Sequence, residues 1–194
     1  MPGSGSSQIL QVRGSALRAR LLWIKDKHGA DGLAQLEREL SAAGRYVLHE
    51  HVEPKAWYNF PLFVEVGTVM DRLWGNGDQS LSIELGRYGA HVGTPWLYQP
   101  FIRLGSVDWV LGRASKLWGE LFTAGAFHVK HEPGQSRAEG EIVEFPSSHM
   151  VLVYSCLGFS MGCIELSGGK NVTGEVVAAR ARGAERDLVR VAWA

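Results

Sequence analysis

The stretch MVLVYSCLGFSMGCIEL, residues 150–166, decides the fold of this chain. It is apolar throughout except for one charged residue, Glu165, and it includes two serines and two glycines. Its length lies at the lower limit of about 17 to 25 residues for a membrane-spanning helix. We therefore predict no membrane span but a helix over about 147–166, buried on all sides of a core. Gly158 and Gly162 would let another backbone approach closely, and we expect that backbone to belong to a sheet.

The two cysteines of the chain, Cys156 and Cys163, both fall in this predicted helix. Seven residues apart, they share a face but lie about 10 Å from each other, too far for a disulfide. We interpret both as small buried hydrophobic side chains. Free thiols and a start without a signal peptide predict a reducing, cytoplasmic compartment.

Length and composition predict a single globular unit. The chain has 194 residues, 45% of them hydrophobic, which is enough to bury one core of ordinary size. Twenty basic residues balance twenty acidic ones, so no overall field would attract nucleic acid. We expect residues 1–13, which begin MPGSGSS, to be a flexible tail and residues 14–194 to form one domain.

The front half of the chain carries helical periods, and the rear half changes to the period of strands. Gly29 separates two predicted amphipathic helices, and further helices are expected at 61–75, 78–93 and 107–125, the last being the longest amphipathic one. AFHVKHE (126–132) and RAEGEIVEF (137–145) bracket a PGQS turn, and strands are expected at 172–181 and 186–193. The predicted fold class is α+β, with a helical N-terminal half packed on a four-stranded antiparallel sheet and a β-β-α-β-β C-terminal half.

The last two strands form a predicted hairpin with a three-residue loop at 182–184. Ala179 would then face Asp187, and Val177 would face Val189. Alternation places one set of side chains on the covered face: Ala179, Ala181, Val189, Val191 and Trp193. The arginines of the hairpin, with Leu188, would occupy the other face, which we interpret as solvated; an anion-binding role for them stays an alternative.

This order of elements, the segment KAWYNFPLFVEVGTVMDRLWGNGDQSLSIELGRYGA (55–90) and the terminal hairpin resemble one superfamily. It contains the 4-vinyl reductase domain, the heme nitric-oxide-binding domain and the TRAPP trafficking subunits. The chain is most similar to bacterial 4-vinyl-reductase-like proteins of myxobacterial type. The resemblance implies the fold but does not fix the function, because one fold hosts many functions.

Three departures from this superfamily bear on chemistry. Its heme-binding members place a ligand histidine after a leucine in a central helix, and the matching stretch SKLWGEL has Trp118 there. Their Tyr-x-Ser-x-Arg clamp is also missing, since YSCLG offers Tyr154, Cys156 and Gly158. Relatives with facing cysteines in the last hairpin are matched by Ala179 and Asp187. The resemblance therefore implies no heme by this route, and we expect no cofactor.

No other pattern in the sequence indicates catalysis or a metal. The histidine pairs His49/His51 and His128/His131 lack a third ligand at a fixed spacing, so we expect no metal site. No nucleophile turn, phosphate loop or dinucleotide motif is present. These observations favour a binding module over an enzyme, although the family name leaves reduction of a vinyl tetrapyrrole open as a third possibility.

Aromatic residues of the helical half predict a hydrophobic pocket edged by a few polar groups. The candidate ligand-binding residues are Trp57, Tyr58, Tyr88, His91, Trp96, Arg103, Arg113 and Trp118. The alternative interpretation is that the aromatic side chains are simply core. We expect a non-catalytic regulatory module that binds a hydrophobic small molecule or mediates signalling contacts, as a homodimer. A protein-interaction adaptor without a ligand, contacting small GTPases or other signalling partners through PWLYQPF (95–101), is the alternative.

Overall fold

The computed structural model describes residues 9–49, 51–92 and 106–194. Thirteen helices and strands follow one another in these residues, with a short 3₁₀ turn, Arg180–Arg182, before the last strand. In chain order they are β1 (Gln11–Arg13), α1 (Gly14–Glu39), α2 (Ala42–His49), β2 (Trp57–Asn59), α3 (Phe60–Trp74), α4 (Leu81–Val92), α6 (Val107–Leu111), α7 (Ala114–Leu121), β3 (Ala126–Lys130), β4 (Arg137–Val143), α8 (Met150–Leu166), β5 (Thr173–Ala178) and β6 (Asp187–Ala192).

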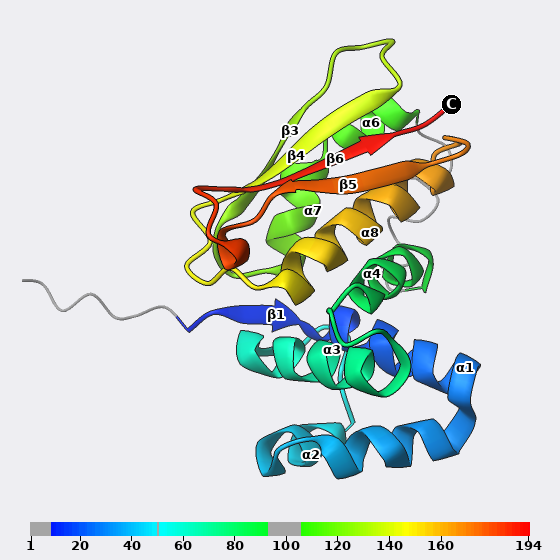
Figure 1. The fold of residues 1–194 in the computed structure, drawn as a ribbon, viewed down its shortest axis with the longest axis vertical. Helices are drawn as coiled ribbons and strands as arrows, with labels where there is room; N and C mark the ends of the chain where they lie inside the picture. Colours follow the sequence, from blue (N-terminus) through cyan, green and yellow to red (C-terminus); the bar gives the residue numbers. More distant parts are fainter. Residues whose placement is uncertain (1–8, 50, 93–105) are drawn as a thin grey trace, which may run out of the picture.

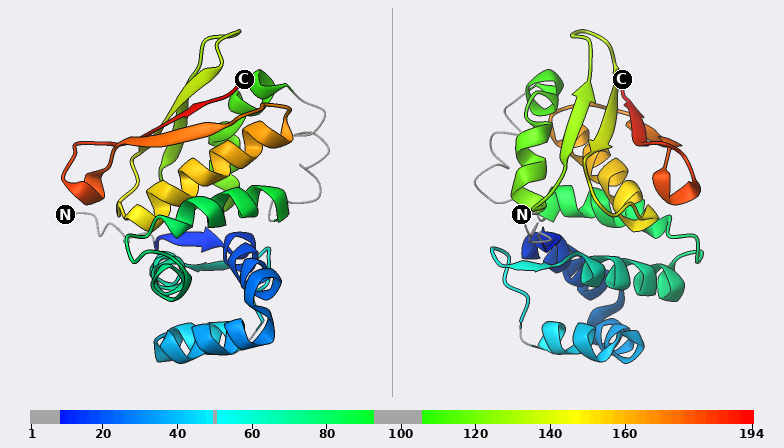
Figure 2. Two further views of the ribbon diagram at one scale, coloured as in Figure 1. Left: turned by 45° about the vertical axis from the view of Figure 1, so that its right-hand side comes forward. Right: turned by 90° about the vertical axis from the view of Figure 1, so that its left-hand side faces the viewer.

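A four-stranded antiparallel sheet in the order β3-β4-β6-β5 confirms the predicted fold class. Helices α7 and α8 cover one face of this sheet, and α4 lies behind α8 (Figure 1). Helices α1, α2 and α3 form a further layer, with α2 farthest from the sheet (Figure 2). The opposite face of the sheet carries ion pairs between strands, in which Arg190 binds Glu139 and Glu175. Among the described residues, no helix is both long and apolar enough to cross a membrane.

Helix α8 is buried as predicted, but its glycines face α4 and not the sheet. A Cβ on Gly158 would overlap the carbonyl oxygen of Ile83, and a Cβ on Gly86 would overlap the carbonyl oxygen of Ser155. The two helix backbones therefore pass directly over each other at these two glycines. The expectation that Gly158 and Gly162 pack on a sheet is wrong, because Leu157 and Met161 make the contact with β5 at Gly174.

The helical half agrees with the prediction at Gly29 and differs from it in two other places. Gly29, with φ 65° and ψ −155°, bends α1 into the two expected helical segments. The single long helix expected at 107–125 is instead two helices, α6 and α7, because the chain leaves helical geometry at Arg113 (φ −112°, ψ 3°). Residues 11–13, inside the expected tail, form β1, which pairs with β2 and buries Val12 completely.

The last hairpin has the predicted register next to the turn, where Ala178 pairs with Leu188, and differs from it by one residue farther along β5. Val176, not Val177, pairs with Val189, because β5 has an irregularity between Val176 and Ala178. The turn is the 3₁₀ segment followed by Gly183 in the left-handed conformation. Ala179, Val189 and Val191 are buried as expected, but Leu188 is buried too and Ala181 is exposed.

A buried carboxylate closes this hairpin onto the start of α8. The Asp187 side chain is fully buried and accepts hydrogen bonds from the Arg180 backbone N–H (2.7 Å), the Arg180 Nε–H (2.8 Å) and the Ser148 hydroxyl (2.8 Å). Arg180 also donates to the carbonyl of Phe145 (2.9 Å). Asp187, at the centre of this network, is one of the two positions that the resemblance matches to the facing cysteines of relatives; Ala179 is the other.

We predict that Gly158→Ala lowers the free energy of unfolding by about 3 kcal/mol, because the new methyl group meets backbone that cannot move without separating α4 from α8. Gly119→Ala is the matched control. Gly119 lies in α7, a Cβ there would meet no atom within 4 Å, and the change should raise the free energy of unfolding by about 0.5 kcal/mol. Urea denaturation of both variants measures these changes, and equal stabilities would contradict the close approach.

We predict that Asp187→Ala lowers the free energy of unfolding by about 3 kcal/mol, because the Arg180 backbone N–H and the Ser148 hydroxyl lose a buried acceptor. Asp31→Ala, an exposed position on α1, should change stability by less than about 0.5 kcal/mol. Thermal or urea unfolding followed by circular dichroism compares the two. A loss at Asp187 no greater than at Asp31 would show that the network contributes nothing.

Candidate functional site

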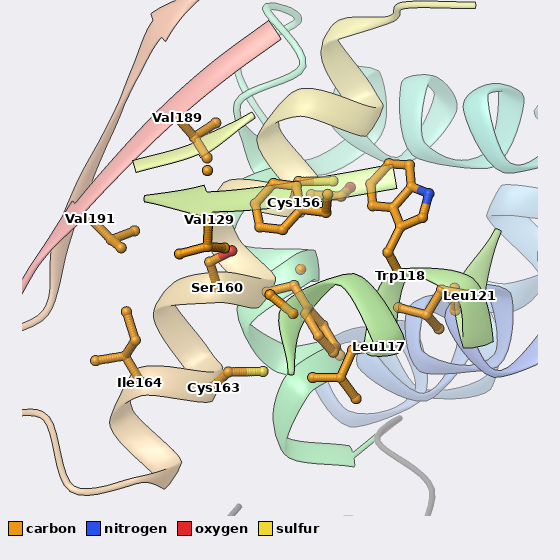
Figure 3. A pocket seen from close by; sticks show the side chains of 18 of the residues that line it. Leu117, Trp118, Leu121, Val129, Cys156, Ser160, Cys163, Ile164, Val189 and Val191 are labelled. Carbon is orange, nitrogen blue, oxygen red and sulfur yellow. The ribbon is translucent and has the colours of Figure 1, made fainter. Parts of the chain in front are cut away.

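A cavity of about 110 Å³ lies between the sheet and the helices that cover it. Its walls come from α7, α8 and α4, from strands β3, β4 and β6, and from the first turns of α1 (Figure 3). Figure 3 labels part of this lining: Leu117, Trp118 and Leu121 of α7, Val129 of β3, Cys156, Ser160, Cys163 and Ile164 of α8, and Val189 and Val191 of β6. The wall is almost entirely apolar, which is typical of small-molecule sites.

Local sequence patterns place these side chains around the cavity. Strand alternation turns Val189 and Val191 inward while Arg190 points to the solvated face of the sheet. Helical spacing puts Leu117 and Leu121 on the inner side of α7. Because α8 is apolar all round, one side of it can pack on α4 while another lines the cavity.

Trp118 is the candidate residue that the resemblance matches to the ligand histidine of the heme-binding members. It is 5% exposed, and its indole N–H donates to the carbonyl of Ala124 at 2.9 Å. Its ring lies parallel to Phe127 at 6.0 Å between centroids and edge-on to Phe145 at 5.5 Å. An indole offers a donor and no lone pair to a metal, so Trp118 cannot take the role of an iron ligand.

The two cysteines line the cavity as thiols. Burial, and secondarily the charge of Asp187, raise the pKa of Cys156 far above its ordinary value. Burial alone raises the pKa of Cys163 to about 12. Protonated thiols are poor nucleophiles and poor metal ligands, so neither cysteine is activated for chemistry.

The lining does not fit a heme. Sites for cofactors and drug-sized ligands enclose about 300 to 1,000 Å³, several times the volume available here. The inner face of α7 presents an indole with its N–H already bonded, and the thiols opposite are protonated. Among the described residues, no three His, Cys, Asp or Glu side chains lie together as a metal site would require.

One charged side chain lines this apolar cavity from α1. Arg20 is 3% exposed, and its guanidinium lies over the ring of Phe63 at 3.8 Å. It donates to the Ser155 hydroxyl at 2.8 Å and to the carbonyl of Ala16 at 3.3 Å. Burial lowers the pKa of Arg20 to about 9, because the charged form has lost its water without gaining a carboxylate.

Of the predicted pocket residues, Trp118 lines the cavity and the other described ones lie elsewhere. Trp57 is in β2, where the guanidinium of Arg13 stacks over its ring at 3.7 Å. Tyr58, beside it, accepts a hydrogen bond from the backbone N–H of Glu53 at 2.9 Å. Both contacts therefore lie within the two-stranded sheet and the loop that precedes β2.

The remaining candidates sit at the surface. The Tyr88 hydroxyl donates a hydrogen bond to Asp26. Partial burial is the larger cause, and this hydrogen bond the smaller one, of a rise in the pKa of Tyr88 to about 12. His91 Nε2 lies 3.5 Å from Glu165, and Arg113 stacks over Trp109 at 3.7 Å. Trp96, Arg103 and the PWLYQPF segment lie outside the described residues.

Sequence reasoning missed Arg20, the residue that gives the cavity its charge. A signal was present: Arg20 falls three residues after Leu17 and four before Ile24, on the apolar stripe of its helix. A charged residue on the apolar stripe of a helix is buried together with that stripe when the stripe faces the core. Attention to the aromatic residues alone could not find it.

Comparison with known proteins identifies the architecture. No family model matches the chain, and no curated protein is similar to it in sequence. Solved structures are similar in fold: an H-NOX protein from S. oneidensis in the Fe(II)NO ligation state superposes with a TM-score of 0.69 at 12% identity, covering 94% of this chain and 99% of that one. The Fe(II) unliganded H-NOX protein from K. algicida gives 0.68 at 10% identity, over 94% and 96% of the two chains.

An oxygen-binding H-NOX domain related to soluble guanylate cyclases gives a TM-score of 0.65 at 14% identity, over 93% and 94% of the two chains. This chain has the H-NOX fold. At these identities the similarity establishes the architecture alone, since function depends on the residues of the site. The likeness to the 4-vinyl reductase and TRAPP branches, and a bacterial origin, stay predictions.

We predict that Trp118→Ala lowers the free energy of unfolding by about 3 to 5 kcal/mol, because it removes a large side chain from the wall and opens the cavity further. Trp118→Phe keeps a ring in place and loses only the bond to Ala124, so it should cost about 1 to 2 kcal/mol. Urea unfolding distinguishes them. Equal costs would mean that the indole N–H, and not its packing, is what Trp118 contributes.

Proposed function

We propose that this chain is a non-catalytic ligand-binding domain that holds a small apolar molecule in the cavity between α7, α8 and the sheet. The observation that carries the proposal is the cavity itself: about 110 Å³ of space with an apolar wall built from segments far apart in the sequence. Native cores seldom leave such space, because unfilled volume forfeits packing energy. Residues from β1 onward would act as one domain in this role.

The chemistry of the lining supports binding over turnover. The ionisable groups whose side chains line the wall are a guanidinium and two thiols whose pKa values lie far above neutrality. None of them can act as a general base or an activated nucleophile near pH 7. An oxygen-binding H-NOX domain related to soluble guanylate cyclases has this fold, which supports a signalling role by analogy; heme is not the ligand proposed here.

A ligand in this position would couple parts of the molecule that are distant in sequence. It would contact α7 and α8 on one side and β6 on the other, so occupancy would favour one spacing between the helices and the sheet. A regulatory output would follow from that population shift. Homodimer formation and the adaptor alternative stay predictions, since PWLYQPF lies outside the described residues.

We predict that toluene, a small apolar probe, stabilises the protein by about 1.4 kcal/mol at ten times its dissociation constant, raising Tm by about 3 to 6 °C. Ala114→Leu, which adds a branched side chain to the cavity wall on α7, should abolish the shift without loss of stability.

Ala43→Leu is the matched control, because the same change on exposed α2 should leave the toluene response unaltered. Differential scanning fluorimetry across a toluene series measures all three proteins. An absent shift in the unaltered protein, or an equal shift in Ala114→Leu, would contradict binding in this cavity.

A further inference from the structure

We propose that the ligand of this cavity carries a carboxylate, that Arg20 binds the carboxylate, and that the apolar wall takes the rest of the molecule. The inference rests on the proposed function and names its ligand class: a small aromatic or aliphatic monocarboxylic acid. Arg20 would thus be a specificity-determining residue.

Arg20 is a buried charge with no counter-ion among the residues that the structure describes. It is 3% exposed, and no carboxylate of the described residues lies within ion-pair distance of its guanidinium. Glu139 belongs to the cavity wall, but its carboxylate accepts from Arg190 at 2.8 Å on the opposite face of the sheet. An isolated buried charge costs several kcal/mol, so buried arginines are normally paired.

The guanidinium also has donors to spare. Its Nε–H has no hydrogen-bond partner, although the atom is fully buried. One Nη donates to Ser155, and the other makes only the long 3.3 Å contact with Ala16. The planar edge formed by Nε–H and a neighbouring Nη–H matches the two oxygens of a carboxylate, which such a fork binds in bidentate fashion.

The surroundings hold the fork in place without neutralising it. The Ser155 hydroxyl donates to the Val151 carbonyl at 2.5 Å, so its oxygen is turned to accept from Arg20. Phe63 supports the flat face of the guanidinium at 3.8 Å. A preorganised donor set loses little side-chain entropy on binding, which is how specificity is gained at a single contact.

The composition of the wall selects a carboxylate over a phosphate. A phosphate monoester carries nearly two charges and three acceptor oxygens, and would need further cations or backbone donors. Beyond Arg20 the lining offers mostly aliphatic and aromatic carbon, with Ser155 and Ser160 as its hydroxyls on α8. The single positive charge of Arg20 matches the single negative charge of a carboxylate, and the apolar wall matches an apolar ligand body.

The test compares 3-phenylpropionate with its neutral analogue 3-phenylpropanol by isothermal titration calorimetry on the full chain at pH 7. We expect the unaltered protein to bind the carboxylate at least about tenfold more tightly than the alcohol. Arg20→Met, which keeps the length and removes the charge, should bind both equally. Arg18→Met, an exposed position on the same helix, should behave as the unaltered protein.

A second measurement does not depend on the folding of a variant. In the unaltered protein, the ¹⁵Nε–H resonance of Arg20 should move downfield with 3-phenylpropionate and stay in place with 3-phenylpropanol, since only the carboxylate supplies a charged acceptor.

Arg20→Lys, which retains the charge without the fork, should keep a reduced preference for the acid.

The outcomes separate the two proposals. Binding of the alcohol with equal or weaker binding of the acid leaves the ligand-binding domain standing and overturns the role of Arg20. Retention of the preference in Arg20→Met overturns it as well. Binding of neither probe by the unaltered protein, together with no response to toluene, overturns the ligand-binding domain itself.

Discussion

The contact between α4 and α8 at Gly86 and Gly158 is the constraint on which the rest of the structure depends. Any side chain at either position would enter the backbone of the facing helix. This close approach lets α8 bury one side against α4 while another side meets the sheet, so a helix without a polar face is fully satisfied. The contact also borders the cavity between α7, α8 and the sheet, since Gly86 belongs to its wall. A wider crossing would expose α8; the glycines therefore maintain both the core and the site.

The sequence predicted those parts of the fold that depend on hydrophobic period. An apolar run with no polar face must be buried, and strands that alternate must cover one face of a sheet, so α8 and the four strands of an antiparallel sheet followed from pattern alone. The packing of Gly158 on α4 did not follow from the pattern, because a glycine permits close approach of another backbone but does not determine which element approaches. The hairpin register shifted by one because a strand irregularity leaves no trace in alternation. Trp118 was found through a resemblance, whereas Arg20 required knowing that its helix face is enclosed.

Burial of the Arg20 charge lowers the stability of the folded protein, whereas the proposed binding of a carboxylate requires that same buried charge. Its burial lowers the pKa to about 9, which means that the folded protein holds this charge less favourably than the unfolded chain does. Stability from this group is therefore reduced at neutral pH and would rise between about pH 9 and its ordinary pKa, as the buried form loses its proton while the unfolded form keeps it. An apolar residue there would remove that cost. A bound carboxylate would remove it too, and would thereby couple ligand affinity to the stability of the helical layer.

The same architecture can serve different ligands because the fold determines where the cavity lies and the side chains determine what enters it. In the H-NOX structures this fold belongs to proteins solved with Fe(II) and with NO or oxygen. Here the inner face of α7 carries Trp118, whose N–H is bonded to Ala124, and aromatic rings fill the surrounding space. An indole offers no lone pair to a metal, and its ring forms part of the cavity wall. The apolar cavity with the Arg20 guanidinium in its wall is compatible with the small organic acid proposed as its ligand.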